Sequence, residues 1–217
     1  MSAAQPSEAV VRVRPVTPEL WPELEAFFGP SGAYSHCWCV WWRVSGSQFD
    51  AGCAERGAGN RTLLERLTGE GAEPGLLGYD GSGEPVGWVG LAPRGQYPRL
   101  LRSPTLRPDP EAGAVDPDHE AGIWALTCFW IPRVRRGRGV ATALLTAAVA
   151  HARERGATAL EAYPVDTKGE RGTAASLYTG TTGMFERAGF REVRRRREKR
   201  PVVRLDFIRP LRQQPHP

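Results

Sequence analysis

The segment RVRRGRGVATALLTAAVAHARERGA, residues 133–157, places four arginines and two glycines directly before a stretch rich in alanine and leucine. From Val140 to Ala152 the apolar residues recur at helical spacing, and Gly156 is placed to end a helix. The start of a helix exposes unpaired N–H groups and the positive end of its dipole, which attract anions. The segment therefore predicts a helix whose start binds an anion.

The two glycines favour a phosphate at this position. A backbone without a Cβ atom can approach a phosphate closely, and Arg135, Arg136 and Arg138 add positive charge that packing of the helix does not require. The alternative is a helix with a basic, solvated entrance. A P-loop is excluded because no Gly-Lys-Ser/Thr follows, and a dinucleotide fold is excluded because GxGxxG is missing.

The chain before this segment mixes strands and helices. Alternation of apolar and basic residues predicts a strand over 10–16, and helical spacing after a threonine cap predicts a helix over 17–29. A second helix is expected over 50–67. Two apolar runs around an Asp-Gly-Ser-Gly turn predict a hairpin with strands at 75–79 and 85–92.

The second half continues this mixture. Residues 93–120 are rich in proline and predict a long loop, which in a compact domain is usually functional or mobile. Continuous apolar residues predict a central strand over 122–131, and a further strand is expected over 158–165. A broken helix over 172–190 and a closing pair of strands over 191–211 complete the prediction.

Length and composition indicate one soluble domain spanning residues 1–217, with an ordered core over about 8–211 and a tail at 212–217. No apolar run approaches the roughly 20 residues that span a bilayer, and no signal segment opens the chain, so we expect a cytoplasmic protein without a membrane partner. The four cysteines lack disulfide or zinc spacing, including the HCWC cluster at 36–39, so we expect reduced thiols and no metal.

Two motifs resemble those of the GNAT N-acetyltransferase superfamily. Arg136-Gly137-Arg138-Gly139-Val140-Ala141 is similar to its acetyl-CoA-binding motif R/Q-x-x-G-x-G/A, and GMFERAGF at 183–190 resembles its later phrase LYEKLGF. The resemblance implies an α/β fold of the mixed α+β kind, the GNAT-type acyl-CoA N-acyltransferase fold. Its central, mostly antiparallel sheet is flanked by helices and splayed between strands 4 and 5, here 122–131 and 158–165.

The resemblance also implies where acetyl-CoA binds as co-substrate. The pantetheine would pair along the exposed strand edge at Cys128, Phe129, Trp130 and Ile131, and the pyrophosphate would bind the amides of Arg136, Gly137, Arg138, Gly139, Val140 and Ala141. The implied activity is acetyl transfer to a primary amine of a small molecule by direct attack on the thioester, with a homodimer expected from the family. An acyl-CoA-binding sensor without catalysis and a protein lysine or N-terminal acetyltransferase are the alternatives.

Transfer to an amine needs a base for the amine and an acid for the departing thiolate. In the family a tyrosine of the LYEKLGF phrase is the acid, but Phe185 occupies that position here. Tyr178 and Ser176, a few residues upstream, are the candidate acids. The candidate bases are carboxylates and a histidine beside the two central strands, namely Glu120, Glu161, His119 and Asp166.

Aromatic residues after the first helix are candidates for an acceptor pocket, because the resemblance places the pocket there. Tyr34, Trp38, Trp41 and Trp42 would form its wall, and plain core packing is the alternative. The loop at 93–120 would cover this pocket, and its Arg94, Arg99 and Arg102 would favour an acidic acceptor group. The basic run 194–197 has glutamates beside it and no recognised binding module around it, so we expect no nucleic-acid partner.

Overall fold

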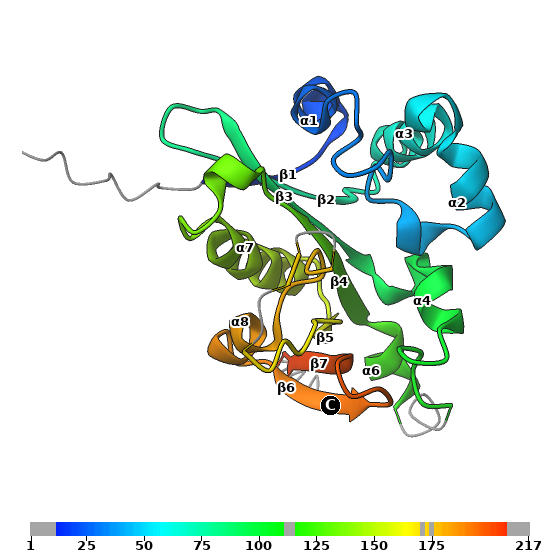
Figure 1. Ribbon diagram of the computed structural model, residues 1–217. Helices are drawn as coiled ribbons and strands as arrows, with labels where there is room; N and C mark the ends of the chain where they lie inside the picture. Colours follow the sequence, from blue (N-terminus) through cyan, green and yellow to red (C-terminus); the bar gives the residue numbers. More distant parts are fainter. Residues whose placement is uncertain (1–11, 111–115, 170–171, 174–175, 208–217) are drawn as a thin grey trace, which may run out of the picture.

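The computed structural model describes residues 12–110, 116–169, 172–173 and 176–207. Their strands form one seven-stranded sheet in the order β1-β2-β3-β4-β5-β7-β6 (Figure 1). The bounds are β1 (Arg12–Pro15), β2 (Gly75–Tyr79), β3 (Pro85–Pro93), β4 (Ile123–Trp130), β5 (Ala159–Ala162), β6 (Arg191–Arg195) and β7 (Pro201–Asp206). All neighbours are antiparallel except β4 and β5, which are parallel, so the predicted mixed, mostly antiparallel fold is confirmed.

Helices cover both faces of the sheet. They are α1 (Trp21–Phe28), α2 (Gly46–Gly52), α3 (Ala54–Gly69), α4 (Pro98–Arg102), α6 (Pro117–Ala121), α7 (Val140–Glu154) and α8 (Thr182–Arg187). Figure 1 shows α1, α2 and α3 on one side of the sheet and α7 and α8 on the other. The cores match this division, because one apolar cluster packs α7 on the sheet and a second packs α1 and α3. Among the described residues, no helix has the length and apolar character that crossing a membrane requires.

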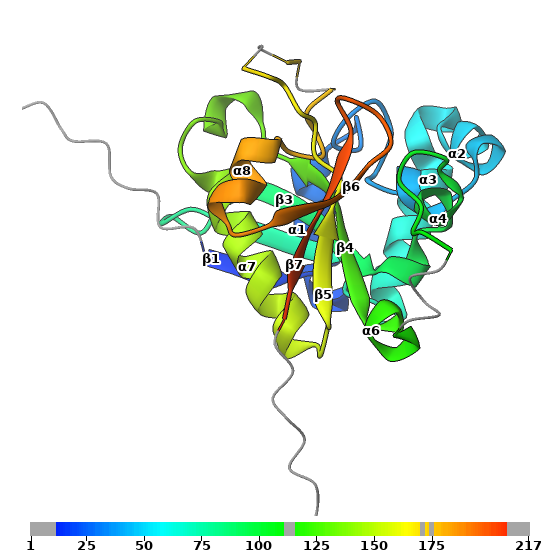
Figure 2. The ribbon, with the colours of Figure 1, turned by 90° about the horizontal axis from the view of Figure 1, so that it is seen from below.

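The sheet divides between β4 and β5. Ile123–Leu126 pairs with Ala159–Ala162, and beyond these four pairs the two strands no longer pair (Figure 2). A bulge lies at the same level on the other edge of β4, because Gly90 pairs with Cys128 while Leu91 pairs with Leu126. A bulge bends its strand and increases the local twist. The second half of β4 is thereby turned away from β5, which opens a cleft in the sheet.

The glycine turn and its helix form as predicted. Gly137 and Gly139 have φ angles of +73° and +78°, a left-handed conformation that residues with a Cβ rarely adopt. Helix α7 begins directly after Gly139, which caps it without any side-chain hydrogen bond. Gly156, with φ +77°, follows its end. The first N–H groups of the helix are therefore left without a side-chain acceptor from the capping residue.

The segment 93–120 differs from the predicted loop. It contains the 3₁₀ turn Arg94–Gln96 and the short helices α4 and α6, while residues 111–115 lie outside the described part of the chain. Tyr97 and Leu100 are buried in a third apolar cluster against the sheet. The segment has too few apolar residues among its prolines for helical spacing to be recognised in the sequence. Those that it has hold the segment against the sheet by packing into this cluster.

Two helix predictions are corrected as well. The helix expected over 50–67 is a pair of helices, α2 and α3, which meet at Cys53, and α3 is kinked near its start by Glu55, Arg56 and Gly57 in left-handed conformation. Helix α2 starts earlier than expected, at a capping box formed by Ser45 and Gln48. In the part of the expected broken helix 172–190 that the structure describes, which leaves out 174–175, only the six residues of α8 are helical, and Tyr178 lies before them outside any helix.

Candidate functional site

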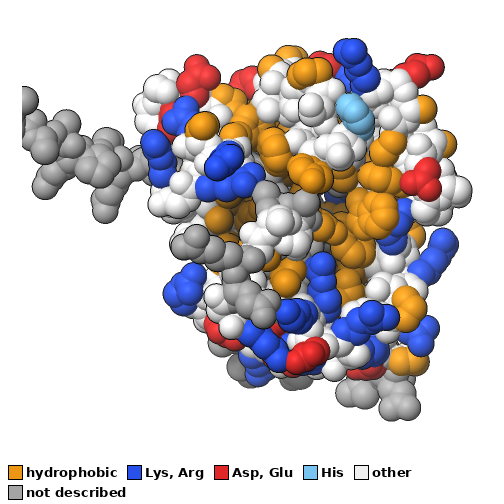
Figure 3. Space-filling view, viewed as in Figure 1, with side chains coloured by type: hydrophobic (Ala, Val, Ile, Leu, Met, Phe, Trp, Pro, Cys, Tyr) orange, Lys and Arg blue, Asp and Glu red, His pale blue; other side chains and the backbone are white. Residues whose placement is uncertain are grey.

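A pocket of about 840 Å³ lies over the half of β4 that has no partner in β5. The end of β4 forms its floor through Cys128, Phe129 and Trp130, together with Ile131, which directly follows the strand. Figure 3 shows the hollow at the centre of this face, with hydrophobic side chains inside it and basic side chains around it. All four strand residues expected to hold the pantetheine are therefore in one cleft.

One end of the pocket is the glycine turn. Gly137, Gly139 and the first residues of α7, Val140, Ala141 and Thr142, line it together with Arg135, Arg136 and Arg187. Arg136 donates from Nε to the carbonyl oxygen of Ile131 at 2.8 Å, which fixes the turn against the end of β4. Arg135 pairs with Asp80 at 3.0 Å. Three guanidinium groups and open helix N–H groups give this end the character of an anion site.

Arg138 is the exception among the motif residues. Its side chain is exposed and is not among those that line the pocket. The left-handed glycines on either side of it line the pocket, whereas residue 138 does not. Of the two contributions expected from Arg138, its charge and its backbone amide, the structure supports only a positive charge near the site.

The other end of the pocket is aromatic. Trp41 packs edge-on against Phe49, with ring centroids 4.7 Å apart, and the guanidinium of Arg99 lies 3.6 Å from the centroid of the Trp41 ring. Trp42 and Tyr34 also line the pocket, and Tyr34 is 53% exposed. Three of the four predicted wall residues are therefore in place. Arg99 supports the wall from behind instead of facing a substrate.

Trp38 is the fourth, and its predicted place in the wall is corrected. Its side chain is only 4% exposed and packs against Trp21 and Phe28, with centroid distances of 6.2 and 5.7 Å. The backbone here repeatedly takes left-handed values, as at Ser35, His36, Trp38 and Cys39. This irregular path turns Trp38 into the core under α1, while its neighbours face the pocket.

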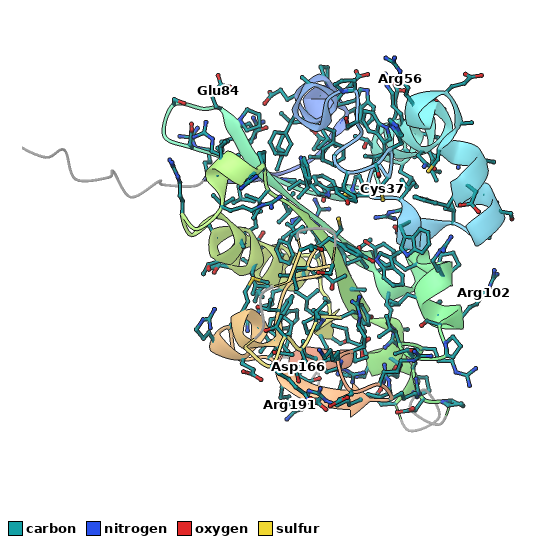
Figure 4. The ribbon with its side chains drawn as sticks, viewed as in Figure 1. Cys37, Arg56, Glu84, Arg102, Asp166 and Arg191 are labelled. Atoms are coloured by element: carbon teal, nitrogen blue, oxygen red, sulfur yellow. The ribbon has the colours of Figure 1, made fainter. Side chains whose placement is uncertain are left out.

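Three thiols and one phenol lie at the middle of the pocket. Cys37, Cys39, Cys128 and Tyr178 line it, and Cys39 Sγ is 3.0 Å from Cys128 Sγ without a disulfide. In Figure 4, Cys37 lies between the helices of the upper layer and strand β4. Burial raises the pKa of Cys37 to about 12. The hydrogen bond with Cys128, followed by burial, raises the pKa of Cys39, and burial raises that of Tyr178.

Tyr178 and Ser176, the two predicted acids, are placed differently. The Tyr178 side chain faces the pocket, and its carbonyl oxygen accepts a 2.6 Å hydrogen bond from the N–H of Phe129. The hydroxyl of Ser176 bonds to the carbonyl of Thr173 at 2.8 Å outside the pocket lining. Phe185, in the position of the family's tyrosine, is fully buried against Phe190. Tyr178 is thus the one of the three that reaches the pocket.

Glu120 and Glu161, the leading base candidates, are held in a buried ion-pair network. Arg94 lies 2.6 Å from Glu120 and 3.2 Å from Glu161, while Arg204 lies 2.7 Å from Glu161. Tyr163 also donates to Glu161 at 3.0 Å. Burial alone would raise the pKa of Glu161, but the two guanidinium groups hold it below its ordinary value. Neither carboxylate lines the pocket, so the structure argues against the predicted role of base.

His119 and Asp166 are equally remote from the pocket lining. His119 lies 3.5 Å from Asp206 on β7. Asp166 pairs with Arg195 at 2.8 Å, and this hydrogen bond lowers its pKa. Figure 4 shows Asp166 beside the strands β6 and β7, well below Cys37 in this view. Both predicted bases therefore belong to the surface around β7.

Two of the three arginines assigned to the loop, Arg94 and Arg99, have structural partners. Arg94 belongs to the ion-pair network, Arg99 stacks on Trp41, and Arg102 is exposed on α4. The described part of the loop does not line the pocket, so the predicted cover over the acceptor is not observed. In the basic run, Arg194 and Arg196 bind acceptors in the same segment, the carbonyls of Leu106 and Arg107.

Several pocket residues were missed by the sequence prediction. Phe49 lines the pocket from α2, which starts at residue 46, before the helix that the sequence predicted. Met184 and Arg187 line the pocket from α8, while Phe185 faces the core. Residues three apart share a helix face, so this spacing was a usable signal for Arg187. Within the described ranges, no three His, Cys, Asp or Glu side chains are grouped as a metal site would require.

Comparison with known proteins places this geometry in a family. The sequence profile described as "Acetyltransferase (GNAT) family" matches residues 38–190. A GCN5-related N-acetyltransferase from Kribbella flavida is 17% identical, with a TM-score of 0.51 over 94% of this chain and 100% of that chain. A GNAT family acetyltransferase from Listeria monocytogenes is 12% identical, with a TM-score of 0.52 over 91% of this chain and 95% of that chain. Both likenesses concern the fold. No curated protein matches the sequence significantly.

Proposed function

Because this chain belongs to the GNAT family of acetyltransferases, we propose that it transfers an acetyl group from acetyl-CoA to a primary amine of a small molecule. One observation carries the proposal. A single pocket runs from the glycine turn, past the half of β4 that has no partner in β5, to the aromatic wall. A donor held at the turn and an acceptor held at the wall would therefore meet over the strand.

The pyrophosphate of the cofactor would bind the N–H groups at the start of α7. A Cβ atom added to Gly137 or Gly139 would contact no other atom of the protein within 4 Å. The space beside these glycines is therefore not filled by protein packing, and a ligand could occupy it. Arg136 and Arg187 face the same end and match the charge of a diphosphate. We expect no metal to be needed, since guanidinium and N–H groups supply the positive potential.

The pantetheine would follow β4. The N–H of Phe129 bonds to the carbonyl of Tyr178, so the backbone groups of Phe129 point to the edge of the strand that faces the cleft. Every second residue of a strand points its N–H and carbonyl groups to the same edge. The carbonyl of Phe129 and the N–H of Ile131 therefore face the cleft as well. These two groups would pair with the amides of the pantetheine arm. The thioester would then lie near Cys128 and Tyr178.

The chemistry would be direct attack without an acyl-enzyme. The amine lone pair attacks the thioester carbonyl carbon, and the C–S bond breaks as the new C–N bond is completed. Tyr178 is protonated at neutral pH, because burial raises its pKa, and would give its proton to the leaving thiolate. The proton lost by the attacking nitrogen then restores the phenol.

Acetyl-CoA binding, measured by calorimetry, tests the proposal. Gly139→Glu places a carboxylate at the expected pyrophosphate site and should abolish micromolar binding. Gly156→Glu is the matched control, because Gly156 has nearly the same φ angle, +77° against +78°, and also faces open space. Thiol release with an amine panel then separates an enzyme from a sensor. A folded wild type that binds no acetyl-CoA would refute the assignment.

The alternatives predict different acceptors. A protein acetyltransferase would modify peptides with lysine or a free N-terminus in preference to small amines, and a sensor would bind acetyl-CoA without releasing thiol. The single domain over 1–217, the cytoplasmic location and the homodimer stay predictions. Size-exclusion chromatography with light scattering is the direct measurement for the dimer.

A further inference from the structure

We infer that the acceptor is an aromatic amine whose nitrogen is uncharged at neutral pH, such as an amine attached directly to an aromatic ring. This inference rests on the proposed acetyl transfer and specifies the acceptor class for that site. Three features of the pocket carry it: the aromatic wall, the sign of the charges, and the protonation of its ionisable groups.

The wall favours a flat apolar acceptor. Trp41 is fixed between Phe49, edge-on at 4.7 Å, and Arg99, stacked at 3.6 Å. Arg99 is itself held by a 3.0 Å hydrogen bond from its Nε to the carbonyl of Val44. A ring held in this way needs no reorganisation to receive another ring. Offset or edge-to-face contacts between aromatic rings stabilise such an arrangement beyond the burial of their area.

The charges disfavour an ammonium group. Among the lining residues that the structure describes, the charged ones are Arg135, Arg136 and Arg187, and there is no aspartate, glutamate, lysine or histidine. Glu120 and Glu161 are already neutralised by Arg94 and Arg204 outside the lining. An alkylammonium would enter this pocket without a counterion, and an unpaired buried charge is costly. A neutral amine avoids that cost.

The ionisable groups of the pocket offer a proton but do not accept one. Cys37 and Cys39 are kept as thiols by burial and by the contact with Cys128, and Tyr178 is kept as a phenol. An alkylamine, with a pKa of about 10 like that of lysine, would need a base to become nucleophilic. An amine on an aromatic ring is a free base at neutral pH and has its lone pair available. The site therefore has the acid that the leaving group needs and matches an acceptor that needs no base.

The atoms balance in this reaction. The aromatic amine forms a C–N bond to the acetyl carbon, the C–S bond breaks, and the sulfur keeps the electron pair until the phenol of Tyr178 protonates it. The cationic nitrogen of the intermediate is strongly acidic and returns one proton to the phenolate. The products are the N-aryl acetamide and coenzyme A as its thiol.

The test compares matched acceptors on the full-length protein with acetyl-CoA at pH 7.5. Aniline and benzylamine have the same ring and differ by one CH₂ group, but only benzylamine is protonated at this pH; cyclohexylamine lacks the aromatic ring. Thiol release and mass spectrometry of the amide product are measured. We expect kcat/KM for aniline to exceed that for benzylamine by about 100-fold, the lower range of what a missing base costs.

A substitution at the mouth of the pocket sharpens the comparison. Tyr34 lines the pocket and is 53% exposed, so Tyr34→Glu adds a carboxylate without opening the core. It should raise kcat/KM for benzylamine about tenfold, through an added ion pair and a base. Tyr34→Gln, of the same shape but uncharged, should not. Acetyl-CoA affinity of both variants should stay within about twofold of the wild type.

The outcomes separate this inference from the proposed function. Equal or faster acetylation of benzylamine by the wild type overturns the inference and leaves acetyl transfer standing. Binding of acetyl-CoA with no acetylation of any aromatic amine overturns it too. Absence of acetyl-CoA binding by the folded protein overturns the proposed function itself.

Discussion

The N–H of Phe129 donates a 2.6 Å hydrogen bond to the carbonyl oxygen of Tyr178. This bond fixes the loop before α8 to the unpaired half of β4, where β5 no longer provides a partner. The loop is tied to the chain that follows β5 as well, because the N–H of Val165 donates to the carbonyl of Gly180 at 2.9 Å. The two bonds hold the phenol over the pocket although Tyr178 belongs to no helix or strand.

The first prediction concerns the hydroxyl of Tyr178. Tyr178→Phe keeps the backbone bond and removes the proton donor, so kcat should fall about 100-fold while the Kd for acetyl-CoA stays unchanged. Steady-state thiol release and calorimetry measure the two quantities. Tyr34→Phe is the control and should change kcat little, because Tyr34 lies at the mouth of the pocket. An unchanged kcat in Tyr178→Phe would exclude Tyr178 as the acid.

The second prediction concerns Arg187, which lines the pocket from α8 and is proposed to bind the diphosphate of acetyl-CoA. Arg187→Gln should weaken acetyl-CoA binding about tenfold, equivalent to about 1.4 kcal/mol. The loss should shrink as salt is raised, since a partly exposed charge is screened within about 10 Å at 0.1 M. Arg191→Gln is the control on the neighbouring strand, where Arg191 pairs with Asp206. A loss independent of salt would assign Arg187 a packing role instead.

The third prediction concerns the stability provided by Glu161. Its side chain is completely buried, and Glu161→Gln leaves Arg94 and Arg204 short of a charge partner, so the free energy of unfolding should fall by about 3 kcal/mol. Glu84→Gln, at the exposed turn between β2 and β3 (Figure 4), should change it by less than about 0.5 kcal/mol. Urea unfolding measures both.

The pH dependence of this difference has a definite sign. The pKa of Glu161 is lowered in the folded protein, so its contribution is fully present above the unfolded value, about 4.3, and is lost as the pH falls through the folded value. The gap between wild type and Glu161→Gln should therefore be constant from pH 6 upward, on the order of 3 kcal/mol, and close in acid. A gap that widened in acid would contradict the ion-pair assignment.

The fourth prediction concerns Cys37. Because burial raises its pKa to about 12, alkylation by iodoacetamide at pH 7.5 should be slow and should rise about tenfold per pH unit up to pH 9. Acetyl-CoA should protect Cys37, which lines the pocket, but not Cys53, which does not. Peptide mass spectrometry follows both residues in one sample. Equal protection of both would indicate a general change in stability instead of a ligand in the pocket.

Local sequence signals predicted the parts of the fold that depend on neighbouring residues. The hairpin strand at 75–79 and the start of α7 at Val140 are observed as expected, because turn glycines and helical spacing act over a few positions. The bulge in β4 had no such local signal. It depends on pairing with β3, which is set by residues almost 40 positions away.

The parts of the candidate site that backbone groups form were predictable from the sequence. The parts that depend on contacts between distant side chains were less predictable. The glycine turn and the floor of β4 are in the pocket as predicted. The expected bases Glu120 and Glu161 are not, because Arg94 and Arg204 approach them from distant parts of the chain. Spacing within one element could not reveal such partners. Trp38 was misplaced because the resemblance gives the place of the pocket in the chain, but not the path of a segment with several left-handed residues.

The division of the sheet has a consequence for how the chain assembles. Strands β1 to β4 are neighbours in chain order, whereas β5, β7 and β6 form a separate group, and only four residue pairs of parallel strand join the two groups. The junction is parallel, unlike the strand pairings inside each group, and parallel pairing is less stable per residue and slower to form. We expect docking of the two groups to be the late step. A ligand that contacts β4, α7 and α8 together would hold the docked state, so substrate supply and the lifetime of the folded enzyme would be linked.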